Sequence, residues 1–146
     1  MFEPKTFEEC LNQRLLRKIK PSTKQALSQL EKAAVLLDEA KSSLETCKSN
    51  SAFIVAYTAM LDSAKAVLFR DGFREKSHAC VIKYLETNYL KEFGVSTIKL
   101  LDGYREKRHR VMYDGEFYAD LDDATRIVNF ATEFIKTVKK IVDSKK

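Results

Sequence analysis

The sequence predicts an all-α protein, an up-down antiparallel bundle of four long helices and two short ones. Only four glycines and two prolines occur among 146 residues, which is too few for the many tight turns of an all-β fold. Apolar residues recur at spacings of three and four along most of the chain, as in an amphipathic helix. No segment shows the alternation of apolar and polar residues that is typical of a half-buried strand.

Six segments carry the helical pattern, and five of the predicted starts have a residue that can cap a helix. Thr6 and Ser22 are each followed three residues later by a glutamate or a glutamine, which is the spacing of a capping box. Ser77, Ser96 and Asp120 have side chains that can accept a hydrogen bond from a first helical turn. The predicted helices cover residues 6–19, 22–48, 51–71, 77–90, 96–113 and 120–143.

One domain over residues 1–146 accommodates these helices, with a core at about 22–143 and the short helix 6–19 in front of it. The length suits one domain, and 45% of the residues are hydrophobic, which is enough to form a core. The alanines of segment 51–71 allow close approach of neighbouring helices, so we expect this helix to be central and buried. Short connections favour antiparallel neighbours.

The charge balance allows an anionic partner. The formal net charge is +5 and the isoelectric point is near 9.0, which suits binding of RNA or a nucleotide. Known catalytic and phosphate-binding motifs such as the P-loop, GxSxG, HExxH and the dinucleotide glycine motif do not occur.

The cysteines argue against a metal site, and the hydropathy argues against a membrane protein. Cys10, Cys47 and Cys80 are far apart and form no CxxC pair, so we expect no zinc site and no cofactor. We interpret them as buried, reduced thiols. No apolar run is expected to be long enough to cross a membrane, and the polar N-terminus does not resemble a signal peptide. We therefore expect a cytoplasmic protein.

The segment LLDGYREKRHRVMYDG, residues 100–115, carries the candidate site. On a helix, Arg105 and Arg108 fall in the same arc as the apolar residues of this segment. A guanidinium group cannot lose its charge, so it must meet a carboxylate, water or an anionic ligand. His109 lies at the edge of the arc one turn after Arg105, and Tyr113 follows one turn after His109. The residues expected to point outward are Glu106, Lys107 and Arg110.

Each candidate residue has a structural and a functional interpretation. Arg105 and Arg108 either lie over the edge of the core, in water or paired with an acid, or face a cleft that receives a phosphate or a base. His109 either moves a proton in RNA cleavage or is a partly exposed histidine on a basic helix. Tyr113 can pack with its hydroxyl at the rim of the site, and His78 is expected to be structural or exposed.

Residues 25–142 resemble HEPN domains in the order and spacing of four short motifs. An A-x-x-x-A-Y-x-A-M segment is followed by an A-K-A-L-L-like stretch, a K-S-H segment and the R-x-x-A-D-Y-like signature of one HEPN branch. The matching residues are Ala52, Ala56, Tyr57, Ala59 and Met60, then Ala64, Lys65, Ala66 and Leu68, then Lys76, Ser77 and His78, and finally Arg108, Val111, Met112, Tyr113 and Asp114.

The resemblance implies a small helical bundle, commonly a homodimer, that is linked to nucleotide and RNA chemistry. Many small HEPN proteins are encoded beside a minimal nucleotidyltransferase. The ribonuclease members gather an arginine and a histidine at a dimer cleft and cleave RNA without metal. Here only three residues separate Arg105 from His109, no histidine follows Arg108 at the family spacing, and Val111 stands at the usual histidine position.

Three functions are compatible with this pattern. The favoured one is a non-catalytic HEPN module that binds a nucleotide or RNA and is the partner of a minimal nucleotidyltransferase in a toxin–antitoxin-like system. The first alternative is a metal-independent endoribonuclease toxin in which Arg105 and Arg108 stabilise negative charge, His109 moves the proton and Tyr113 completes the site. The second alternative is a purely structural helical adaptor, which requires both arginines to be paired with acids.

Overall fold

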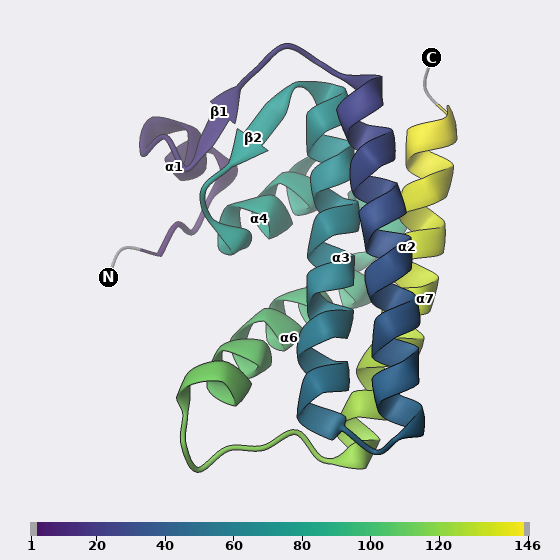
Figure 1. Cartoon of the computed structure of the whole chain (residues 1–146). Helices are drawn as coiled ribbons and strands as arrows, with labels where there is room; N and C mark the ends of the chain where they lie inside the picture. Colours follow the sequence, from purple (N-terminus) through teal and green to yellow (C-terminus); the bar gives the residue numbers. More distant parts are fainter. Residues whose placement is uncertain (1–2, 145–146) are drawn as a thin grey trace.

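The computed structural model describes residues 3–144, and it confirms the predicted all-α helical bundle (Figure 1). Four of the helices are long, as expected, and a short antiparallel strand pair accompanies them. In chain order the elements are α1 (Phe7–Asn12), β1 (Leu16–Lys18), α2 (Thr23–Glu45), α3 (Ser49–Asp71), β2 (Phe73–Glu75), α4 (His78–Asn88), α5 (Leu90–Phe93), α6 (Val95–Tyr113) and α7 (Leu121–Ser144).

Helix α3 is the centre of the bundle. It lies side by side with α2 and α7, and α4 and α6 cross it at a steep angle (Figure 1). Fourteen of its residues are buried, among them five alanines that let the neighbouring helices approach closely. The apolar stripe of α7, from Ala124 to Val142, covers one side of this helix. Burial of these stripes is the main favourable contribution to the stability of the fold.

Most of the predicted helix starts are confirmed by hydrogen bonds at the caps. The hydroxyl oxygens of Thr6 and Ser22 each accept a bond of 3.1 Å from a backbone N–H three residues later. Ser77 caps α4 in the same way at 3.4 Å, and the carboxylate of Asp120 accepts from the first turn of α7 at 2.8 Å. The prediction for Ser96 is wrong, because α6 begins one residue earlier, at Val95.

The predicted first helix over 6–19 is wrong beyond its first turns. Helix α1 ends at Asn12, and residues Leu16–Lys18 form a strand that pairs antiparallel with Phe73–Glu75. The chain leaves the helix at Arg14, which has a φ of 57°. Leu16 is buried against the core, and the strands are too short for an alternating pattern to be visible in the sequence.

Gly72 allows the two strands to meet directly after α3. Its φ is 94°, and its carbonyl oxygen accepts a hydrogen bond of 2.9 Å from the backbone N–H of Ile19. A Cβ atom at this position would lie 2.9 Å from the Ile19 carbonyl oxygen and 2.9 Å from Pro21. Glycine is therefore needed here both for the left-handed conformation and for the close approach of Ile19 and Pro21 to the backbone of Gly72.

The prediction of three reduced, buried cysteines is wrong. Cys10 of α1 and Cys80 of α4 form a disulfide with a Cα–Cα distance of 5.8 Å, and both residues are fully buried. Cys47 is a free thiol and is exposed. The spacing of cysteines along a chain does not give their pairing, and these two meet only because α1 packs on α4.

The expectation that no segment is long and apolar enough to cross a membrane is also wrong for α3. By length and composition Ser49–Asp71 passes this test. Its apolar side chains are used inside the bundle, since 78% of its most apolar stretch is buried there. A central core helix of this kind has the same composition as a membrane span.

Candidate functional site

A cleft of about 540 Å³ opens between the start of α4, the second half of α6 and the segment before α1. Three arginines and two histidines contribute to its walls, together with two glutamates. The lining residues are Glu3, Pro4, Ser77, His78, Ala79, Arg105, Glu106, Arg108, His109 and Arg110. A concave site of this volume is large enough for a nucleotide-sized ligand.

Helix α6 is fixed to the core by its first half, which leaves its basic second half to line the cleft. Leu101 is buried, and the ring of Tyr104 lies 5.9 Å from the ring of Phe53 and 5.2 Å from that of Phe130. These contacts hold α6 between α3 and α7. The next turns therefore present their charged residues at the edge of the core.

Arg105 is held by acidic residues on two sides. Its Nε donates to Asp102 at 2.9 Å, and its Nη2 donates to Glu3 at 2.9 Å. Burial opposes the charged form of Arg105, but these hydrogen bonds and charges outweigh it and raise the pKa of the guanidinium. Its position fits the interpretation in which the arginine is paired with an acid, and Glu3 places a carboxylate inside the cleft.

Arg108 has no such acidic partner among residues 3–144. Its guanidinium carbon lies 5.7 Å from the centre of the Tyr57 ring, which is a cation–π distance. Its Nε is buried and donates no hydrogen bond within the described chain. A buried charged donor without an acceptor is costly. Because Arg108 also lines the cleft, an anionic ligand that binds its guanidinium group would offset this cost.

His78 belongs to the cleft as well, although the sequence suggested a structural or exposed residue. It is the first residue of α4, and its Nδ1 lies 3.4 Å from the hydroxyl of Tyr57. Burial lowers the pKa of His78 to about 4, and the positive charges of Arg108, Lys65 and Arg105 contribute to this shift. Burial raises the pKa of Tyr57 to about 12, so near pH 7 both groups are neutral, and the tautomer of His78 sets which of them donates the hydrogen bond.

The lowered pKa of His78 predicts an acid-dependent loss of stability. Its pKa is about 4 in the folded chain and near 6.5 in the unfolded chain. The unfolded state therefore binds the proton first, and the free energy of unfolding falls as the pH is lowered through this window. Urea unfolding of the wild type and of His78→Gln across the window should show a smaller decrease for the variant. An equal decrease of the free energy of unfolding in both proteins would contradict the prediction. The matched control is His109→Gln, at an exposed histidine of the same cleft.

His109 and Tyr113 lie at the outer end of α6. His109 is exposed and lines the cleft, and its ring centre lies 4.8 Å from that of Tyr113. Tyr113 is 67% exposed and does not line the cleft. Met112, expected on the apolar side of the helix, is also exposed. Of the four predicted site residues, the structure therefore brings Arg105, Arg108 and His109 together and leaves Tyr113 outside.

Two of the residues of α6 that were expected to point outward make contacts that the sequence did not indicate. Lys107 was expected to point outward, but its ammonium group donates to Asp123 of α7 at 2.7 Å and lowers the pKa of that carboxyl. Arg110, also expected outward, lines the cleft, and its guanidinium lies 4.2 Å from the centre of the Phe117 ring. The loop after α6 turns back along the helix and brings Phe117 to this position.

Sequence reasoning missed His78 and Glu3 as members of the site. The signal for His78 was present, because Lys76-Ser77-His78 was already part of a motif. Glu3 gave no signal, since its place depends on how α1 packs on α4. Within residues 3–144 no group of three or more histidine, cysteine, aspartate or glutamate residues is placed to hold a metal ion.

A comparison with protein families assigns the fold. A family model described as HEPN domain matches residues 26–141, which is most of the chain. No curated protein sequence is similar enough to count as a relative. The matched range begins within α2 and ends within α7, so it includes the helices that form the bundle and the basic half of α6. The chain belongs to the HEPN domain family.

Proposed function

We propose that the protein is a non-catalytic HEPN module that binds the phosphate groups of a nucleotide or RNA in the cleft between α4 and α6. Membership of the family supports a nucleotide- or RNA-related role in general. The observation that carries the specific proposal is Arg108, whose buried Nε has no acceptor within the described chain. A phosphate oxygen is the acceptor that a guanidinium group binds with the best geometry.

The other residues of the cleft suit a phosphate better than a cation. Arg110 adds positive charge on the same helix, whereas the charge of Arg105 is balanced by Asp102 and Glu3. The pKa of His78, lowered to about 4 by burial and by nearby cations, keeps this imidazole neutral near pH 7, so that it can offer one donor or acceptor to a base or a sugar. The cleft is large enough for the whole nucleotide.

We further propose a minimal nucleotidyltransferase as the partner, in a toxin–antitoxin-like system, and a homodimer as the assembly. HEPN domains commonly dimerise, and α6 ends in the exposed apolar residues Met112 and Tyr113 beside the cleft. The cytoplasmic location stays a prediction, and the Cys10–Cys80 disulfide argues against it, because disulfides are uncommon in reducing compartments.

Replacement of Arg108 tests the proposed binding site. We expect Arg108→Gln to bind adenosine triphosphate and a short oligouridylate RNA about 10- to 100-fold more weakly, because a charge-assisted hydrogen bond is lost. Titration calorimetry measures both affinities. The matched control is Arg126→Gln, since Arg126 is an exposed arginine of α7 paired with Asp122 at 2.9 Å. Absence of binding by the wild type, or an equal loss in the control, would sink the proposal.

The endoribonuclease remains the second candidate, because His109 and His78 both line the cleft beside Arg105 and Arg108. This function predicts cleavage of RNA in the presence of a chelator. His109→Ala should abolish the cleavage without changing the helical content, whereas Arg126→Gln should leave it intact. Intact RNA after incubation with the wild type over a range of pH would exclude this candidate.

The third function, a purely structural helical adaptor, requires Arg105 and Arg108 to be paired with acidic residues. Arg105 meets this condition through Asp102 and Glu3. Arg108 does not meet it within residues 3–144, so a purely structural role for α6 is the least supported of the three functions.

A further inference from the structure

The positive net charge of the protein comes from one part of the sequence. Between Cys10 and Leu30 the chain has five lysines or arginines and no aspartate or glutamate. The whole chain has 26 basic and 21 acidic residues, so the remainder contains 21 of each and is neutral. The five basic residues are Arg14, Arg17, Lys18, Lys20 and Lys24. They precede the matched family range, 26–141, and none of them lines the cleft between α4 and α6.

The fold adds a further arginine to this basic segment. In the strand pair, Arg17 of β1 stands directly opposite Arg74 of β2, and both are exposed. Like charges in directly opposed positions destabilise an antiparallel pair. Within residues 3–144 neither guanidinium makes an ion pair. The next residue of β2, Glu75, forms an ion pair with Lys65 at 3.7 Å instead. The two arginines are therefore not explained by the stability of the sheet.

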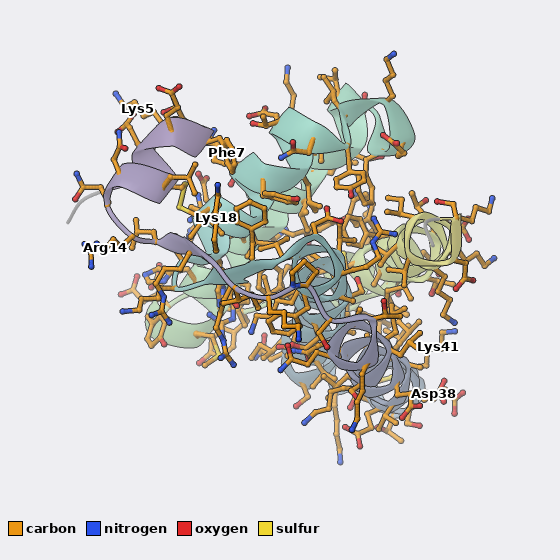
Figure 2. The ribbon with its side chains drawn as sticks, turned by 90° about the horizontal axis from the view of Figure 1, so that it is seen from above. Lys5, Phe7, Arg14, Lys18, Asp38 and Lys41 are labelled. Carbon is orange, nitrogen blue, oxygen red and sulfur yellow. A yellow bond between two sulfur atoms is a disulfide. The ribbon has the colours of Figure 1, made fainter. Side chains whose placement is uncertain are left out.

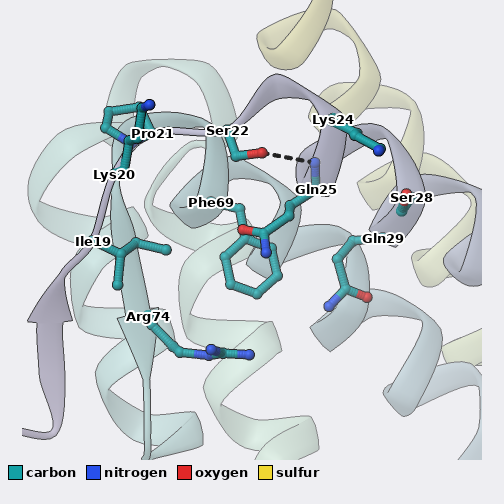
Figure 3. Close-up of a pocket in the computed structure, with 10 residues that line it drawn as sticks. All are labelled: Ile19, Lys20, Pro21, Ser22, Lys24, Gln25, Ser28, Gln29, Phe69 and Arg74. Carbon is teal, nitrogen blue, oxygen red and sulfur yellow. Dashed lines mark hydrogen bonds between the residues drawn. The ribbon is translucent and has the colours of Figure 1, made fainter.

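A hollow of about 880 Å³ lies beside this strand pair, between β2 and the start of α2 (Figure 3). Its charged lining residues are Lys20, Lys24 and Arg74, and no carboxylate is among its lining residues. The Arg74 guanidinium carbon lies 5.8 Å from the centre of the Phe69 ring, a cation–π distance, and both residues line the hollow. Polar side chains of α2 and of the residue that caps it complete the wall. They are Ser22, Gln25, Ser28 and Gln29.

Lys24 is also placed against the preference of the helix. It lies in the first turn of α2, where no acidic residue is present. The start of a helix favours negative charge, so a cation there is unfavourable. Both Lys24 and the Arg17–Arg74 pair thus reduce the stability of the unliganded chain. An anion in the hollow would stabilise Lys24 and Arg74, which line it, and Arg17 lies directly opposite Arg74 at its side.

We propose that the strand pair and the start of α2 form a second binding site, which takes the phosphodiester backbone of RNA. We call it the strand–helix site, and define it by Arg17, Lys20, Lys24 and Arg74. The cations are spread over a strand, a loop and a helix, which suits an extended polyanion better than one phosphate group. The choice of RNA among polyanions rests on the proposed function, whereas the site itself shares no residue with the cleft between α4 and α6.

The salt dependence of RNA binding tests this site. Binding of a fluorescently labelled oligouridylate RNA is followed by anisotropy over a series of potassium chloride concentrations. Each phosphate contact on a single strand contributes about 0.7 to the slope of log K against log salt concentration. We expect Arg17→Gln/Arg74→Gln to reduce the slope by about 1.4 and the affinity on the order of tenfold at low salt. Lys20→Gln/Lys24→Gln should act in the same direction.

The matched control is Lys41→Gln/Lys48→Gln, which removes the same charge from the last turns of α2 and from the residue directly before α3. Figure 2 shows Arg14 and Lys18 on one side of the molecule and Lys41 on the other. Lys41 and Lys48 are exposed. This variant should bind RNA with nearly the wild-type slope. If the control loses as much as the arginine variant, only the net charge matters and the strand–helix site is excluded.

Two further measurements separate this site from the cleft and from a role in folding. The arginine variant should bind adenosine triphosphate as the wild type does, and its melting temperature should be unchanged or higher, because a like-charge pair is removed. A clearly lower melting temperature would assign the arginines to the fold. Absence of RNA binding by the wild type, or binding to phosphatidylserine vesicles in place of RNA, would overturn the proposal even if the cleft binds the mononucleotide.

Discussion

Loss of the Cys10–Cys80 disulfide is expected to lower the free energy of unfolding by about 4 kcal/mol, because the disulfide closes a long loop and so restricts the unfolded chain. The two cysteines are 70 positions apart, and both are fully buried. The bond fixes α1 on α4 and thus the segment that brings Glu3 to Arg105. Its loss should therefore also change the affinity of the cleft, since His78 lies at the start of α4.

The measurement compares the wild type, with and without a reducing agent, with Cys10→Ala/Cys80→Ala. The melting temperature should fall on the order of 10 °C in the variant and in the reduced wild type, and the reducing agent should not affect the variant further. Cys47→Ala is the matched control, because Cys47 is an exposed free thiol. An unchanged melting temperature after reduction would show that the bond does not stabilise the fold.

Replacement of Arg70 by methionine is expected to cost about 3–5 kcal/mol of stability, since it removes the cation that compensates the largely buried carboxylate of Asp71. The Arg70 side chain is only 6% exposed. Its guanidinium donates to the Ile141 carbonyl oxygen of α7, to Asp71 at 3.1 Å and to the Tyr89 hydroxyl at 2.9 Å. It thereby connects the end of α3 with the end of α7 and with the junction between α4 and α5.

The matched control for this prediction is an arginine whose ion pair is in water. Arg126→Met removes a pair with Asp122 in which both side chains are about 70% exposed, and such pairs contribute about 0–1 kcal/mol. Urea unfolding of both variants measures the difference. A cost for Arg70→Met that is no larger than for Arg126→Met would contradict the prediction.

The parts of the fold that local sequence decides were predictable. The long helices followed from apolar spacing, and the starts at Thr6, Ser22 and Asp120 followed from capping chemistry. The strand pair was not predictable, because three residues cannot show alternation and because β1 and β2 are separated by two helices. The apolar residues from Leu11 to Ile19 have the spacing of a helix, but the pairing of β1 with β2 in the folded chain overrides this local preference.

The candidate site was predictable only on the helix that carries most of it. Arg105, Arg108 and His109 follow from one stretch of sequence, because their arc on α6 is fixed by helical geometry. His78 and Glu3 come from other segments, and only the packing of α1 and α4 brings them to the cleft. The network of Arg70 was missed for the same reason, since Tyr89 and Ile141 are distant in sequence.

The contact between Glu3 and Arg105 affects how strongly nucleotide binding to the cleft depends on ionic strength. With an Nη2–Oε1 distance of 2.9 Å, Glu3 acts as an internal counter-ion for Arg105. A ligand that binds Arg105 replaces the carboxylate of Glu3 with its own anionic group. No dissolved ion is therefore released from this arginine. The ionic-strength dependence of nucleotide binding should therefore report fewer contacts than the cleft has arginines.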